Sequence, residues 1–119
     1  MEGIIINKLH CTIQIRLAKK NIFFGPGVLK LLKLTGKYES LSAASKSMGM
    51  SYSKAYKMIK ESEKELGFKL LDRKIGGTNG GGSTLTPECV DFLNLYEKFE
   101  SETKKNADMM FTKYLNKYI

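Results

Sequence analysis

Two consecutive segments of this chain, each opened by a serine and closed by a glycine, constrain its fold more than any other feature. Ser40 or Ser42 can cap a short helix that ends at Gly49, because the left-handed geometry after a helix favours glycine. Ser51 can cap a longer helix that ends at Gly67. Two helices joined by a tight turn that contains glycine predict a helix-turn-helix.

The second of these helices has two unlike faces. A period of about 3.6 residues groups small and apolar side chains at positions 55, 58, 59, 62 and 66 on one side. The opposite side carries Ser53, Lys57, Lys60 and Lys64, flanked by Lys54 and Tyr56. Lysines that face away from a core suit insertion into the major groove of DNA, where they donate to guanine or to phosphates. A solvated charged face is the alternative.

The start of this helix is a better candidate for DNA contact than its end. Ser51, Tyr52 and Ser53 can reach phosphates or base edges, and the positive end of the helix dipole attracts phosphate. Glutamates at positions 61, 63 and 65 indicate that the end of the helix is held away from DNA. We therefore expect the contacts between Ser51 and Lys60.

Five glycines lie within Gly76–Gly82, between a short strand expected at Leu70–Arg73 and a returning strand at Ser83–Leu85. Glycine lets the backbone adopt positive φ and approach another surface closely. This layout predicts a β-hairpin wing over residues 70–85, in which Arg73 and Lys74 would contact phosphates beside the groove. A plain flexible loop is the alternative reading of the glycine run.

The sequence contains no residue pattern typical of an enzyme active site or a metal site. Gly77 and Gly82 have the spacing of a Walker A motif, but Ser83 stands where the phosphate-binding lysine belongs. Cys11, Cys89 and the single histidine lack metal-ligand spacing and show no arrangement of nucleophile and base. We therefore expect no enzymatic activity, no metal and no cofactor.

The two ends of the chain complete the expected fold. Alternating polar and apolar residues at 12–17, followed by Ile22–Phe24, predict an N-terminal β-hairpin over residues 12–24. Helically spaced apolar residues from Val28 onward predict a helix that Gly36 stops, so residues 28–66 form a helical core.

A long helix is expected over residues 86–118. Thr86, Pro87 and Glu88 combine a hydroxyl cap, a proline at the first helical position and a carboxylate at the positive end of the dipole. An interrupted apolar stripe on this helix is the expected dimerisation surface. The stripe consists of Leu93, Tyr96, Ala107, Met110 and Tyr114.

The composition agrees with one basic domain of 119 residues. A formal charge of +8 and 42% hydrophobic residues indicate a globular chain whose field attracts nucleic acid or an anionic membrane surface. No apolar run approaches the ~20 residues that span a membrane. The apolar stretch near the N-terminus is also too short for a secretory signal. We expect a cytoplasmic protein without a membrane partner.

Four motifs resemble the N-terminal DNA-binding domain of the ModE family of molybdate-responsive regulators, a relative of the LysR-type winged helix. They are Ser40-Leu-Ser-Ala-Ala44, Gly49-Met-Ser-Tyr-Ser-Lys-Ala-Tyr56, Asp72-Arg-Lys-Ile-Gly-Gly77 and Gly80-Gly-Gly-Ser-Thr-Leu-Thr86. The resemblance implies that Ser51, Tyr52, Ser53 and Lys54 open the recognition helix. It also implies that residues 73–82 form the wing and that the helix after Thr86 helps dimerisation.

The sequence departs from the family pattern in three respects. Tyr56 stands where the family commonly has tryptophan, and Thr78-Asn79 stands where the wing often carries a lysine. The oxyanion-binding domains of full-length members would need many residues beyond Ile119, so molybdate sensing is not carried over and no small-molecule effector is evident.

The sequence therefore predicts a mainly helical α+β protein, a winged helix-turn-helix with an N-terminal hairpin and a long C-terminal dimerisation helix. We expect a transcriptional regulator that binds double-stranded DNA as a homodimer, the alternative being a protein-interaction adaptor with the same fold. The expected DNA-binding residues are Ser42, Ser51, Tyr52, Ser53, Lys54, Tyr56, Lys57, Lys60, Arg73, Lys74, Gly76, Gly77, Thr78, Asn79 and Gly80.

Overall fold

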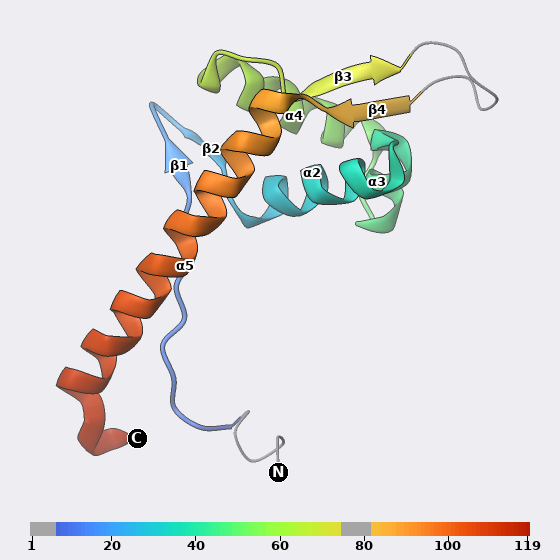
Figure 1. The fold of residues 1–119 in the computed structure, drawn as a ribbon. Helices are drawn as coiled ribbons and strands as arrows, with labels where there is room; N and C mark the ends of the chain where they lie inside the picture. The colour runs from blue at the N-terminus through green and yellow to red at the C-terminus, as the bar shows by residue number, and fades with distance from the viewer. Residues whose placement is uncertain (1–6, 75–81) are drawn as a thin grey trace. The chain divides into compact units, whose positions relative to one another are not determined.

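The computed structural model describes residues 7–74 and 82–119 (Figure 1). Two compact units share these residues. The first, residues 15–94, is called the winged unit below. The second, called the terminal unit, combines the described residues up to Gln14 with Leu95–Ile119. Each unit is described by itself.

The winged unit is a mainly helical α+β fold, as the sequence predicted. It contains two separate two-stranded antiparallel sheets, β1 with β2 and β3 with β4. Its elements in chain order are β1 (Leu17–Ala18), β2 (Ile22–Phe24), α2 (Pro26–Tyr38), α3 (Leu41–Ser47), α4 (Tyr52–Leu66), β3 (Leu71–Lys74), β4 (Gly82–Leu85) and the first turns of α5 (Pro87–Leu115).

The N-terminal hairpin is shorter than the predicted 12–24. Residues 11–17 keep the expected alternation of half-buried and exposed side chains, but only Leu17 and Ala18 pair with β2. The reason is the length of the partner strand, because β2 has three residues and Pro26 begins α2 directly after Gly25. Residues 12–16 therefore keep the alternating exposure pattern of a strand but lie outside β1.

Gly36 does not stop the first helix, which corrects the sequence-based prediction. Helix α2 continues to Tyr38, and Glu39 adopts the left-handed conformation after it, at φ 53°. A Cβ on Gly36 would lie 3.1 Å from Cδ1 and 3.3 Å from Cγ of Leu85 on β4. Glycine at this position thus allows the close approach of a helix and a wing strand, at a helix-propensity cost of about 1 kcal/mol.

The two serine caps of the helix-turn-helix are present as predicted. Ser40 Oγ accepts a hydrogen bond from the Ala43 amide at 3.0 Å, and Ser51 Oγ accepts one from the Lys54 amide at 3.1 Å. Gly49 follows α3 at φ 69°, and Gly67 ends α4 at φ 84°. Of the two candidate caps for α3, Ser40 is the one used.

An aromatic cluster and one buried hydroxyl hold the winged unit together. The ring of Phe92 meets Phe24 edge-to-face at a centroid distance of 5.0 Å, and Phe68 at 6.0 Å. Ser62, fully buried on α4, donates to the Phe23 carbonyl at 2.7 Å. This bond ties α4 to β2 and satisfies a hydroxyl that burial would otherwise leave costly.

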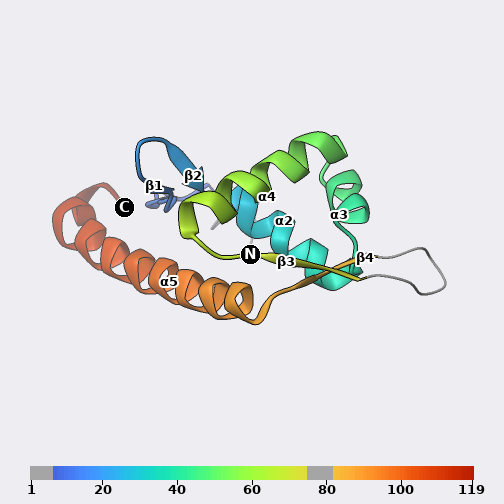
Figure 2. The ribbon, with the colours of Figure 1, turned by 90° about the horizontal axis from the view of Figure 1, so that it is seen from above.

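The wing strands pair from Leu71 with Leu85 to Lys74 with Gly82. The Ser83 amide donates to the Glu39 carbonyl at 3.1 Å, which fastens β4 to the end of α2. In two views the end of β3, the start of β4, α3 and the start of α4 lie on the same side of the winged unit (Figures 1 and 2). The fold thus brings the start of the second helix and the wing to one side.

Thr86 caps α5 as the sequence predicted and also anchors it. Its Oγ1 accepts a hydrogen bond from the Cys89 amide at 3.0 Å and donates one to the Lys69 carbonyl at 2.6 Å. The Thr86 amide donates to the Leu70 carbonyl at 3.0 Å. One residue therefore joins the start of α5 to the segment that leads into β3.

The terminal unit contains the remainder of α5 and a short 3₁₀ helix, η1 (Asn116–Tyr118). α5 ends at Leu115, close to the predicted 118. Among the described helices of the chain, none combines the length and the apolar character needed to cross a membrane.

Candidate nucleic-acid interface

The exposed face of α4 is the one predicted from helical periodicity. Ala55, Ile59 and Ser62 are buried, and Met58 and Leu66 are half-buried. The exposed residues from the N-cap onward are Ser51, Tyr52, Ser53, Lys54, Tyr56, Lys57, Lys60, Glu61 and Lys64. The first turn of α4 contains no acidic residue, so the positive end of its dipole is not neutralised from within the helix. This arrangement attracts phosphate.

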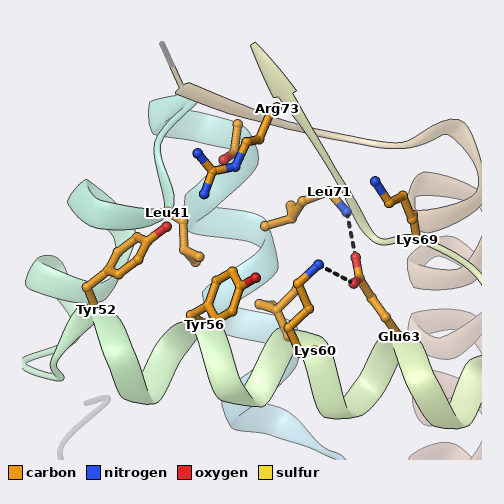
Figure 3. Close-up of a pocket in the computed structure, with 10 residues that line it drawn as sticks. Leu41, Tyr52, Tyr56, Lys60, Glu63, Lys69, Leu71 and Arg73 are labelled. Carbon is orange, nitrogen blue, oxygen red and sulfur yellow. Dashed lines mark hydrogen bonds and ion pairs between the residues drawn. The ribbon is translucent and has the colours of Figure 1, made fainter. Parts of the chain in front are cut away.

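Two tyrosines form an aromatic ledge on this face. The rings of Tyr52 and Tyr56 stack at a centroid distance of 6.2 Å and an interplanar angle of 24°. The Lys60 ammonium lies 5.3 Å from the centre of the Tyr56 ring, within the range of a cation–π contact. Figure 3 shows both rings rising from α4 toward the wing strand that carries Arg73.

Arg73 is a wing-strand cation that lies beside this face (Figure 3). It lies on β3 opposite Ser83 of β4, and its side chain is exposed. Tyr52, Tyr56 and Arg73 line the same cavity, together with Lys60. Arg73 of β3 and the exposed tyrosines of α4 therefore lie around one pocket.

The predicted sites away from this cluster have separate outcomes. Ser42 is exposed on α3, and its carbonyl accepts a hydrogen bond from Ser45 Oγ at 2.9 Å. The backbone of Lys74 pairs with Gly82. The predicted wing-tip residues lie outside the described residues: Gly76, Gly77, Thr78, Asn79 and Gly80.

Glu63 is a residue of the site that the sequence did not single out. One of its carboxylate oxygens, Oε2, accepts hydrogen bonds from the amides of Leu70 at 2.8 Å and Leu71 at 3.4 Å. The other, Oε1, lies 3.3 Å from the Lys60 ammonium. The sequence showed only a glutamate in an acidic stretch. Its role depends on how the chain returns after Gly67, which helical periodicity does not report.

The predicted dimerisation stripe divides into two parts. Leu93 and Tyr96 are 5% and 3% exposed, so they are buried within this chain, which corrects their assignment to a dimer surface. Met110 and Tyr114 are 60% and 67% exposed, and Ala107 is half-buried. The exposed part of the stripe therefore lies in the C-terminal half of α5.

Cys89 and His10 occupy different environments. Cys89 is fully buried, and burial, with a smaller contribution from the charge of Glu63, raises the pKa of its thiol to about 12. His10 is exposed, and its Nδ1 lies 2.7 Å from the Lys8 carbonyl oxygen. Over residues 7–74 and 82–119, no group of three or more potential metal ligands comes together.

The fold and the exposed basic helix correspond to a known family. A family model described as the bacterial regulatory helix-turn-helix protein, LysR family, matches residues 28–89, more than half of the chain. The chain belongs to the LysR family. The matched segment runs from α2 to the first turn of α5, so it contains the helix-turn-helix and both wing strands. The description of this family is that of a regulatory protein and not of an enzyme.

Curated relatives agree with the resemblance to ModE. The transcriptional regulator ModE of Haemophilus influenzae is 34% identical over 86 residues, which are 72% of this chain and 33% of that protein. The dual regulator ModE of Escherichia coli K12 is 30% identical over 92 residues, 77% of this chain and 35% of that protein. The molybdenum-pterin-binding protein MopB of Rhodobacter capsulatus is 28% identical over 107 residues, which are 90% of this chain and 39% of that protein. This LysR-family chain spans about a third of their length.

Solved structures support the winged helix-turn-helix fold. The DNA-binding domain of BenM in complex with benA site 1 DNA superposes with a TM-score of 0.52 at 23% identity, covering 71% of this chain and 89% of that one. The complex of the same domain with catB site 1 DNA gives a TM-score of 0.53 at 20% identity, covering 76% and 91%.

Proposed function

We propose that this LysR-family chain is a transcriptional regulator that binds specific sites on double-stranded DNA, with the start of α4 in the major groove. The observation that carries the proposal is the start of α4, which is exposed, has no acidic residue in its first turn and lies beside Arg73 of β3. The relatives named as transcriptional regulators and the structural neighbours solved on DNA support it. A regulator of this kind acts on cytoplasmic DNA.

The face of α4 divides into base-reading and phosphate-binding positions. Ser53, Lys54 and Lys57 extend from the first two turns of the helix, where a recognition helix reaches base edges. Lys60 and Arg73 would contact phosphates beside the groove. Beyond Arg73 and Lys74, the glycine-rich loop at 76–82 would approach the backbone of the DNA closely.

The proposed regulator works as a homodimer. The exposed part of the α5 stripe, formed by Ala107, Met110 and Tyr114, would bury apolar surface against a second copy. A two-fold dimer presents two recognition helices to half-sites separated by about one turn of DNA or a multiple of it. The expected operator is therefore pseudo-palindromic.

DNA binding is tested by fluorescence anisotropy with labelled operator and random duplexes across a range of salt concentrations. Lys57→Ala should weaken binding to the operator, and each lost phosphate contact should reduce the slope of log K against log salt by about 0.9. Lys64→Ala is the matched control, because Lys64 lies on the same helix face two turns further along. Wild-type affinity in a Lys54, Lys57 and Lys60 triple alanine variant would overturn the proposal.

A further inference from the structure

A cavity of about 160 Å³ opens between α4 and the wing sheet, within the winged unit (Figure 3). Its apolar lining comes from Leu41 of α3, Ile59 of α4 and Leu71 of β3. The stacked tyrosines Tyr52 and Tyr56 line another side. Three elements and two aromatic rings therefore line an open pocket that has both apolar and polar walls.

The unbalanced charge of this cavity is positive. Glu63 is its carboxylate, but Oε2 accepts from two backbone amides and Oε1 pairs with Lys60. Lys69 and Arg73 also line the cavity, and neither forms an ion pair with another of the residues that the structure describes. The charge left for a ligand comes from an ammonium and a guanidinium, which suit an anionic group.

The volume and the walls restrict the body of the ligand. A cavity of about 150 Å³ with apolar walls accommodates benzene, so this one has room for a single six-membered ring with a small substituent. The exposed tyrosine rings offer faces on which a flat ring stacks. The polar rim would hold the substituent, since Ser83 adds a hydroxyl near Arg73.

We propose that this cavity binds a small aromatic carboxylate, with its ring against Tyr52 and Tyr56 and its carboxylate on Arg73. A planar guanidinium can hold a carboxylate through two parallel hydrogen bonds, which fixes the orientation of the ring. Binding of such a ligand is independent of any DNA activity and requires only the geometry of the winged unit.

A regulatory consequence rests on the proposed function. Tyr52, Tyr56, Lys60 and Arg73 belong both to the cavity and to the DNA-facing surface. A bound aromatic carboxylate would neutralise Arg73 and occupy the space beside the tyrosines, so ligand and DNA should compete. By linkage, the ligand lowers the affinity for DNA by the same factor by which DNA lowers the affinity for the ligand.

The binding test uses nicotinate as the probe and follows the backbone amide resonances of the full chain by NMR. Saturable shifts at Tyr56, Lys60, Leu71 and Ser83 are expected with millimolar nicotinate. Nicotinamide, which is neutral, should bind at least about tenfold more weakly, the difference expected from one charge-assisted contact. Cyclohexanecarboxylate, which is not aromatic, should bind about two- to tenfold more weakly because it loses the stacking contact. Equal shifts with all three compounds, or none with nicotinate, would overturn the proposal.

Two variants locate the site. Arg73→Gln should weaken nicotinate binding severalfold, whereas Lys64→Gln, on α4 but outside the cavity, should leave it unchanged. Equal effects of the two substitutions would overturn the assignment. Fluorescence anisotropy with labelled DNA then tests whether nicotinate and DNA compete. If nicotinate binds but does not lower the affinity for DNA, only the regulatory consequence is refuted. If no DNA binds, the proposed function fails while the NMR titration still decides the site.

Discussion

The carboxylate of Glu63 accepts a hydrogen bond from the backbone amide of Leu70 at 2.8 Å. Leu70 is fully buried, so its amide lies where an unpaired donor is costly. The same carboxylate accepts from Leu71, where β3 begins, and pairs with Lys60 on the exposed face of α4. Glu63 therefore fixes the wing strand relative to the proposed recognition helix.

Replacing Glu63 by alanine should destabilise the fold by about 1–3 kcal/mol, the cost of leaving buried donors unpaired. Glu63→Gln keeps an acceptor oxygen and should lose less. Urea unfolding followed by far-UV circular dichroism measures both variants. A smaller loss for Glu63→Ala than for Glu63→Gln would contradict the positioning role. Glu61→Ala, exposed on the same helix, is the control and should be nearly neutral.

Gly82 should not tolerate any side chain, although nothing in the sequence distinguishes it from the other four glycines of the run 76–82. A Cβ on Gly82 would collide with the Glu39 carbonyl oxygen, which is backbone and also holds the Ser83 amide. Gly82→Ala should therefore cost about 1–3 kcal/mol through overpacking or loss of this contact. Gly27→Ala is the matched control, because a Cβ there meets nothing within 4 Å. Similar urea midpoints for the two variants would refute the prediction.

Local features of the winged unit were predictable from the sequence, and contacts between its elements were not. The caps by Ser40, Ser51 and Thr86 depend on a side chain and an amide three residues away, so the sequence alone specifies them. The prediction that Gly36 ends a helix was wrong. Glycine is needed there because Leu85 of β4 packs against it, and the sequence of α2 alone does not reveal that contact.

The same distinction applies to the candidate site. The exposed face of α4 follows from helical periodicity, so Lys57 and Tyr56 were predicted with their correct exposure. The cavity beside Tyr56 forms only when Arg73 of β3 is folded back over α4, which no pattern within α4 encodes. Periodicity also ranked Tyr96 with Met110, although only tertiary packing decides which part of a stripe is buried.

The thiol of Cys89 should make stability depend on alkaline pH. Burial raises its pKa from 9.0 to about 12, so the unfolded chain releases this proton at lower pH than the folded chain does. The contribution of the protonated thiol is therefore complete below pH 9.0 and is lost as the pH rises toward about 12. Urea unfolding of the wild type and Cys89→Ala between pH 8 and 11 measures it, and the free-energy difference between them should shrink. A constant difference would contradict the buried thiol.

Met110 should mediate self-association through the exposed part of the α5 stripe. Its side chain is 60% exposed and lies one helical turn from Tyr114, so a lysine in its place would put a charge into the proposed dimer contact. Sedimentation equilibrium should show the wild type as a dimer at micromolar concentration and Met110→Lys as a monomer.

Met109→Lys provides the matched control for this surface. Met109 is 70% exposed, but successive helical residues differ in direction by about 100°, so it lies off the stripe. The control variant should remain a dimer. Since two linked half-site contacts are lost together, Met110→Lys should also weaken operator binding far more than it weakens binding to a single half-site. Equal association constants for the two methionine variants would remove α5 as the dimer surface.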